Sequence, residues 1–192
     1  MKAAILVDEI NAVSQLHALN IEGIRPWRKF YEAIHSILVH DYGDCHVSYH
    51  FYGAIPPLYL DRERHFLRKR FFDALQKDGI QTHRGFCFNV KGVLQEKGVD
   101  VMVSLDLFEF SLNHYDLLFV FSGDGDICPA VQRAQANGST VIAILGEQQP
   151  ATLMKRLVNG VVPLEAVIDL IEDKYLIPRS NSNHFIKGEM CV

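Results

Sequence analysis

The chain has 192 residues, which is enough for one substantial hydrophobic core and short for two domains. Hydrophobic residues make up 48% and charged residues 22%, the balance of an ordinary globular protein. No apolar run approaches the roughly 20 residues needed to cross a bilayer, so no membrane association is expected. The formal net charge is −4, so a nucleic-acid partner would require a local basic patch.

The cysteines are widely spaced and include no Cys-x-x-Cys pair; they are Cys45, Cys87, Cys128 and Cys191. This spacing predicts neither disulfides nor a zinc knuckle. The first apolar run leads straight into Asp8 and Glu9, a pattern that predicts no secretory segment. The expected protein is therefore reduced and cytoplasmic.

Apolar strands and helices alternate along the chain. In chain order, the sequence predicts a strand at 3–7, a helix at 27–39, a strand at 45–52, a helix at 60–77 and an edge strand at 80–88. It then predicts a helix at 99–113, a strand at 117–121, a helix at 127–137, a strand at 140–145 and short helices at 150–158 and 163–174. This alternation predicts an α/β fold with a central parallel sheet flanked by helices on both faces.

Residues 99–113 carry two possible signals. Their β-branched start favours a strand, but apolar residues recur at helical spacing, in one stripe of Val101, Leu105, Phe108 and Leu112. A second stripe beside it contains Val99, Val103, Asp106 and Phe110. We interpret the segment as a mostly buried helix with Asp106 on an otherwise apolar face. An ionised Asp in that position is costly unless it is paired or bound to a cation.

An acidic loop, Ser122-Gly123-Asp124-Gly125-Asp126, follows the strand at 117–121. Asp8 likewise ends the strand at 3–7. Ligands of open α/β sheets gather at the carboxyl ends of the strands, so these acids are expected to meet there, with Asp106 as a third. Carboxylates that meet repel one another, and Mg²⁺ or Mn²⁺ is the usual counterion. The sequence therefore predicts a metal site for attack on a phosphoester.

Each acid also has a plainer explanation. Asp8 can cap the next helix, and Asp124 and Asp126 can be turn residues that cap the helix after them. Capping and metal binding are equally supported for Asp8 and Asp124, whereas Asp126 fits a helper or a cap better. Asp106 lies inside a helix and has no capping role. Asp100 lies about 240° from Asp106 on an ideal helix, so the two are not expected to share one ligand sphere.

Other acidic and glycine-rich motifs do not fit. A haloacid-dehalogenase-type phosphatase needs a second Asp where Ile10 stands, and the residues from Ile127 to Pro129 break an EF-hand loop. No Walker A sequence occurs, and Cys128 replaces the third glycine of a dinucleotide-binding motif. Four of the histidines can be considered as zinc ligands, but none has ligand partners at zinc spacing, so we interpret them as satisfied or surface side chains; they are His46, His50, His65 and His83.

Residues 62–70 hold five cationic side chains against one Glu. In the expected helix, Arg64 and Arg68 share an outer face and are candidates for binding RNA phosphates, while the core would take Leu67, Phe71, Ala74 and Leu75. Lys97 precedes the 99–113 helix and is a third candidate. The alternative is an ordinary solvated helix face.

Three stretches resemble the NYN-domain family, the LabA-like branch of the PIN-like nucleases. They are Ile5-Leu6-Val7-Asp8-Glu9-Ile10-Asn11, Lys97-Gly98-Val99-Asp100-Val101 with Asp106, and Ser122-Gly123-Asp124-Gly125-Asp126. The resemblance runs over residues 3–146. It implies a single PIN-like domain over residues 1–178, with C-terminal helices at 150–174 and a peripheral tail at 179–192.

The resemblance also implies an activity, cleavage of RNA by a Mg²⁺- or Mn²⁺-dependent endoribonuclease. It implies core metal-binding acids Asp8, Asp106 and Asp124, accompanied by Asp126 and Asp100 and supported by Asn11 and Ser122. PIN-like domains often pair, so a homodimer is expected by analogy. Two alternatives remain, a non-catalytic metal- or RNA-binding regulatory module that keeps the acidic site, and a phosphatase or nucleotidase for small phosphoesters.

Overall fold

The computed structural model describes residues 1–91 and 93–179. Its main sheet contains β1 (Lys2–Asp8), β3 (His46–Ala54), β4 (Gln81–Val90), β5 (Val93–Lys97), β6 (Leu117–Phe121), β7 (Thr140–Leu145) and β8 (Gly160–Pro163). These seven strands lie in the order β5-β4-β3-β1-β6-β7-β8. All neighbours are parallel except β4 and β5, which form an antiparallel hairpin. The predicted parallel sheet is confirmed.

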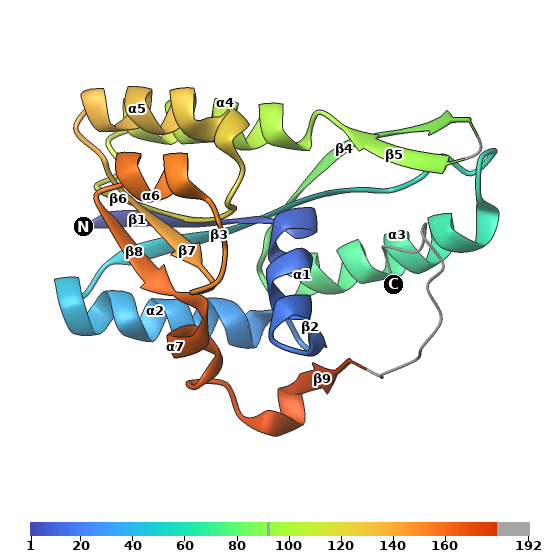
Figure 1. The fold of residues 1–192 in the computed structure, drawn as a ribbon, viewed down its shortest axis with the longest axis horizontal. Coiled ribbons are helices and arrows are strands. Elements are labelled where there is room, and N and C mark those ends of the chain that lie inside the picture. Colours follow the sequence, from blue (N-terminus) through green and yellow to red (C-terminus); the bar gives the residue numbers. More distant parts are fainter. Residues whose placement is uncertain (92, 180–192) are drawn as a thin grey trace.

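Helices cover both faces of this sheet (Figure 1). One face carries α4 (Val99–Leu112), α5 (Cys128–Ala136) and α6 (Thr152–Leu157), with the short 3-10 helix η1 (Gly125–Ile127) before α5. The other carries α1 (Glu9–Ala18), α2 (Arg28–Tyr42), α3 (Arg62–Lys77) and α7 (Leu164–Ile168). A small antiparallel sheet pairs β2 (Ile21–Ile24) with β9 (Leu176–Pro178), which follows η2 (Asp173–Tyr175). The α/β, single-domain prediction is confirmed.

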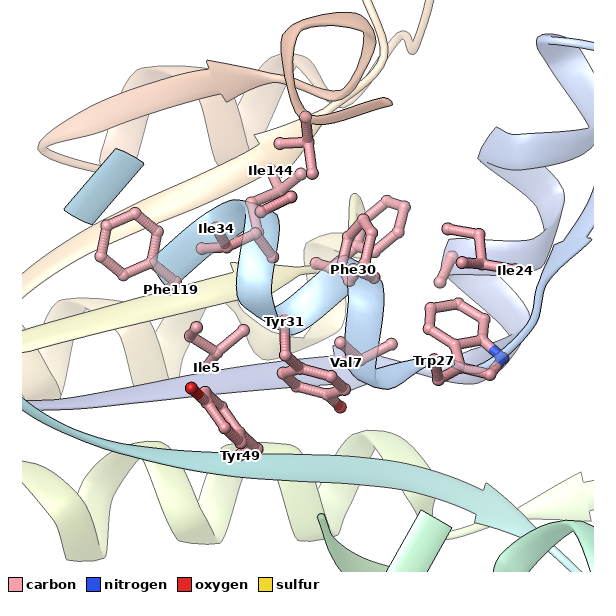
Figure 2. Close-up of a cluster of buried hydrophobic side chains, with 14 of the residues drawn as sticks. Ile5, Val7, Ile24, Trp27, Phe30, Tyr31, Ile34, Tyr49, Phe119 and Ile144 are labelled. Carbon is pink, nitrogen blue, oxygen red and sulfur yellow. The ribbon is translucent and has the colours of Figure 1, made fainter. Parts of the chain in front are cut away.

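Strand alternation divides the core into two layers. Ile5 and Val7 of β1 point toward α2, where Figure 2 shows them among Phe30 and Ile34. Leu6, between them, points to the opposite layer under α4 and α5. Both faces of β1 are buried because residues alternate sides along a strand and helices cover each side.

Several elements differ from the sequence prediction. The strands β2, β5, β8 and β9 were not predicted, because each is short and lacks a long apolar run. The strand expected at the edge, β4, is interior, since β5 pairs along its outer side. Cys45, Cys87 and Cys128 are free thiols, and Cys191 lies with residues 180–192 outside the described part. Within residues 1–91 and 93–179, no helix has the length and apolarity to cross a membrane.

The helix predicted at 99–113 is present as α4, but it is not mostly buried, because only one of its two apolar stripes, the one with Val99 and Val103, packs against the sheet. Val101 and Leu105 are 55% and 60% exposed, and the other members of their stripe, Phe108 and Leu112, are exposed as well. Val103 and Leu107 are fully buried instead. Because α4 is apolar on nearly every side, its sequence carries no signal for which face meets the sheet.

Candidate functional site

A row of polar side chains crosses four neighbouring parallel strands at the carboxyl ends of β1, β3 and β6 and near the start of β4. Asp8 of β1 is in register with Tyr52 of β3, and Tyr52 is in register with His83 of β4. On the other side of β1, Ser122 directly follows β6 and hydrogen-bonds to Asp8. Residues in register on parallel strands point to the same face, so all four side chains lie on the face that α4 covers.

Asp8 is the centre of one half of this row. Its carboxylate is 5% exposed and accepts hydrogen bonds from Ser122 Oγ at 3.1 Å and Asn11 Nδ2 at 2.9 Å. The backbone N–H of Asn11, 3.5 Å from Asp8 Oδ1, makes Asp8 the N-cap of α1. Asp8 therefore has the capping role considered above, and it is also held rigidly at the sheet edge.

The acidic loop is tied to Asp8 through the same two supporting residues. Asn11 Oδ1 accepts from the backbone N–H of Gly123 at 3.1 Å, and Ser122 Oγ is 3.2 Å from the backbone nitrogen of Asp124. Asp124 caps η1 by accepting from the N–H of Asp126 at 2.9 Å. The cap is thus Asp124, whereas Asp126 is exposed.

Electrostatics link the two acids. Burial raises the pKa of Asp8, hydrogen bonds from Ser122 and Asn11 oppose that rise, and the negative charge of Asp124 adds to it. Asp124 is therefore near enough to Asp8 for the carboxylates to repel each other. Two hard oxygen ligands at one sheet edge are the donor type that Mg²⁺ and Mn²⁺ prefer, so these residues fit such an ion.

Asp106 belongs to a second network at the other end of the row. Tyr52 donates its hydroxyl proton to Asp106 Oδ2 at 2.7 Å, and His83 Nδ1 lies 3.2 Å from the same oxygen. His83 Nε2 is 3.1 Å from His50 Nδ1, and His50 Nε2 is 2.9 Å from the hydroxyl of Ser48. All of these hydrogen bonds can form together if Ser48, His50 and His83 each donate to the next group toward Asp106.

The two networks are separate in this structure. Asp106 contacts Tyr52 and His83, whereas Asp8 contacts Ser122 and Asn11, so the two carboxylates have different partners. Within the described chain, His50, His83 and Asp106 are the one set of three metal-type side chains whose ligand atoms lie within 4.8 Å of one another. Of the three predicted acids, the structure therefore brings Asp8 and Asp124 together and places Asp106 among histidines.

Burial disfavours the charged forms of the histidines and of Tyr52 in the second network. It lowers the pKa of His50 to about 3, with the neighbouring His83 adding to the effect. Burial also raises the pKa of Tyr52 well above its usual value, and the charge of Asp106 raises it further. His50 is thus the satisfied histidine expected from the sequence. The roles of Tyr52 and His83 were missed, because only the strand register shows that they share a face with Asp8.

Asp100 lies in the first turn of α4, which begins at the carboxyl end of the sheet and runs back across it (Figure 1). Six residues of α-helix separate Asp106 from Asp100 by about 9 Å along the helix axis. Asp100 is therefore in the turn of α4 nearest the carboxyl end of the sheet, and Asp106 lies farther along the helix.

The basic helix α3 is rotated relative to the prediction. Arg68, expected on the outer face, is 4% exposed and forms a bidentate ion pair with Glu9, directly after Asp8. Its Nε also donates to the carbonyl of Ala54 at 3.1 Å. Leu67, expected in the core, is 49% exposed. The cation replaces the apolar side chain in the interior because Glu9 offsets its charge there.

The three predicted substrate-binding cations nevertheless meet. Arg64, Arg68 and Lys97 line one pocket of about 300 Å³ between α3, the β4–β5 hairpin and the start of α1. Lys97 is exposed and Arg64 is half-buried, so these two can reach a ligand. Arg68 instead forms part of the wall.

The comparisons with known proteins agree with this architecture. The NYN domain family matches residues 2–165. A search of curated proteins found no match. The crystal structure of a protein of unknown function, VPA0982 from Vibrio parahaemolyticus RIMD 2210633, is 22% identical with a TM-score of 0.64, over 92% of this chain and 96% of that one, and shows the same fold.

A second structure, MurG from Acinetobacter baumannii, is 14% identical over 84% of this chain and 41% of that one. Its TM-score of 0.40 is too low to support a structural argument. The family match, by contrast, spans the main sheet and both candidate networks. The chain belongs to the NYN domain family, a nuclease-like family.

Proposed function

We propose that the protein is a metal-dependent endoribonuclease that hydrolyses RNA phosphodiester bonds at the Asp8–Asp124 site. The observation that carries this proposal is the buried carboxylate of Asp8, fixed by Asn11 and Ser122 beside a second carboxylate. Two neighbouring carboxylates, one of them buried, are costly unless a cation offsets their charge. Membership of a nuclease-like family supports the same chemistry.

In this proposal Asp8 and Asp124 hold Mg²⁺ or Mn²⁺, and Asp100 and Asp126 add negative charge at the same sheet edge. Asp106 is the third acid and approaches from α4. Both its hydrogen-bond partners use Oδ2, so Oδ1 is the oxygen it would offer to a cation. When bound, a divalent ion supplies an activated water and offsets charge on the phosphodiester.

The remaining residues position these groups and the substrate. Ser122 and Asn11 fix the carboxylate of Asp8 and tie the loop of Asp124 to it. Lys97 and Arg64, on the pocket next to Asp8, neutralise phosphates of the RNA strand. A local pair of cations explains how a chain with a net charge of −4 holds a polyanion.

The test compares the parent with Asp124→Asn on a labelled single-stranded RNA with Mn²⁺. Loss of a metal ligand removes several kcal/mol of transition-state stabilisation, so cleavage should fall at least about a hundredfold. Asp169→Asn, which changes an exposed Asp at the end of α7, is the matched control and should cut like the parent. If Asp124→Asn folds and cleaves at the parent rate, the site assignment is wrong.

One observation favours the non-catalytic alternative, a regulatory module that keeps the acidic site. Asp106 is engaged by Tyr52 and His83, so only two of the three core acids adjoin in this structure. Calorimetry would then show Mn²⁺ binding by the parent, and no metal would support RNA cleavage. Hydrolysis of p-nitrophenyl phosphate without cleavage of RNA would instead support a small-molecule phosphatase.

A further inference from the structure

The pocket of about 300 Å³ beside the acidic site has its own chemistry. Ile10, two residues after Asp8, forms one wall, and Pro56 and Leu94 contribute further apolar surface. Glu96 also lines it, from β5. A concave site with mostly apolar walls and a few polar groups is the usual form of a ligand pocket.

Glu96 connects this pocket to the proposed catalytic acids. Burial raises the pKa of Glu96 to about 7, with the charges of Glu9 and Asp8 adding to that rise and the charge of Arg68 opposing it. The pocket lining also includes Ile10, two residues after Asp8, and Arg68, which pairs with Glu9 directly after Asp8. A ligand in the pocket is therefore adjacent to the place where a phosphodiester would be cut.

The size of the pocket restricts what can enter. Base pairs of a duplex are stacked and cannot enter a cavity of this volume, whereas one unstacked base can. Ile10 and Leu94 offer apolar surface to the faces of such a base. Arg64 and Lys97 line the same pocket, where the phosphates on either side of the bound nucleotide would lie.

We propose that this pocket binds one unpaired nucleobase of single-stranded RNA and selects bases that carry an exocyclic amino group, with Glu96 as the hydrogen-bond acceptor. Arg64 and Lys97 contact the adjacent phosphates. This inference rests on the proposed ribonuclease function, because it places the base next to the scissile bond.

The selectivity follows from the donors and acceptors of the two pyrimidines. Above its pKa of about 7, Glu96 is ionised and accepts hydrogen bonds at about four positions, so binding is measured above that pH, where Glu96 can take the N–H of Ala54 and an amino group together. Cytosine presents its 4-amino group as a donor, whereas uracil presents an acceptor oxygen at the same position. Cytosine and uracil are alike in size but differ also at N3, which carries a proton only in uracil, so the contact to Glu96 is isolated by comparing the parent with Glu96→Gln on both bases.

The experiment measures fluorescence anisotropy of labelled oligocytidylate and oligouridylate of equal length, in EDTA so that cleavage does not interfere. A good base contact discriminates by roughly five- to a hundredfold, and the parent should prefer oligocytidylate within that range. Glu96→Gln should bring the ratio close to one, because an amide both donates and accepts. Glu109→Gln, at an exposed Glu of α4, should leave the ratio unchanged.

Changes at the cations should act differently. Arg64→Ala and Lys97→Ala should weaken both oligonucleotides equally and reduce the salt dependence of binding. These two variants also test the pocket if Glu96→Gln does not fold. Equal affinity of the parent for both oligonucleotides, or an unchanged ratio in folded Glu96→Gln, would overturn the inference.

The two proposals fail in distinguishable ways. A preference for oligocytidylate without Mn²⁺-dependent cleavage would contradict the ribonuclease proposal and support the base-pocket proposal. Mn²⁺-dependent cleavage that is lost in Asp124→Asn, together with equal affinity for both oligonucleotides, would contradict the base-pocket proposal and support the ribonuclease proposal.

Discussion

Ser122 and Asp8 are 114 positions apart in the chain, and the Ser122 hydroxyl donates to Asp8 Oδ2 at 3.1 Å. The contact exists because β1 and β6 are parallel neighbours in register, so the residues that end them lie side by side. It partly offsets the cost of burying the Asp8 carboxylate.

Asp8→Asn should stabilise the metal-free protein at pH 7. Because the folded pKa of Asp8 is raised by burial, the folded state binds more protons than the unfolded state, and stability falls as pH rises above the unfolded value. Asn removes that penalty and still caps a helix well. Urea unfolding in EDTA checks this; Mn²⁺ should then stabilise the parent and not the variant. A variant less stable than the parent in EDTA would contradict the electrostatic argument.

His50 should make the protein sensitive to acid. Its folded pKa is lowered to about 3 by burial, so between the unfolded value near 6.5 and pH 3 the unfolded state binds the extra proton. Stability from this group is therefore lost as pH falls, by about 1.4 kcal/mol per pH unit. His50→Gln should flatten the curve of unfolding free energy between pH 6 and about pH 4. His46→Gln, at an exposed position of the same strand, should leave the slope as it is.

The buried pair of Glu9 and Arg68 should be sensitive to loss of either partner. Both side chains are under 10% exposed, so Glu9→Gln or Arg68→Met leaves a buried charge without its counterion. The expected loss is about 3–5 kcal/mol of unfolding free energy, measured by urea denaturation. Lys69→Ala breaks the exposed pair with Asp73 on the same helix and should cost under about 1 kcal/mol. Similar losses of unfolding free energy at both pairs would contradict the argument that burial makes the Glu9–Arg68 pair more sensitive.

Leu107 and Leu105 of α4 are the same residue type at buried and exposed positions, so comparing them tests the orientation of the helix. Leu107 is fully buried and Leu105 is 60% exposed. Leu107→Ala should cost about 2–5 kcal/mol through the cavity it leaves. Leu105→Ala should change the unfolding free energy by less than about 0.5 kcal/mol. The reverse order in thermal and urea unfolding would contradict this orientation of α4.

Local sequence signals located most of the helices and the five principal parallel strands. The long apolar runs of β1, β6 and β7 identify buried strands wherever they lie in the chain. The short strands β5 and β8 could not be located in this way, because their stability comes from pairing with β4 and β7 rather than from their own composition. The buried faces of α4 and α3 were not predicted correctly for a related reason. Which side of a helix is buried depends on the elements that pack against it.

By itself the sequence determined that Asp8 ends one buried strand and that Asp124 lies in the loop after another, which is enough to predict that they meet at one edge of a parallel sheet. Only the tertiary structure decided which residues contact Asp106. Its partners Tyr52 and His83 come from strands whose order and register cannot be read from the sequence. The same holds for Arg68, which is buried because Glu9 lies opposite it. Periodicity places a side chain on a face of its own element, but the identity of its neighbours depends on how the elements pack.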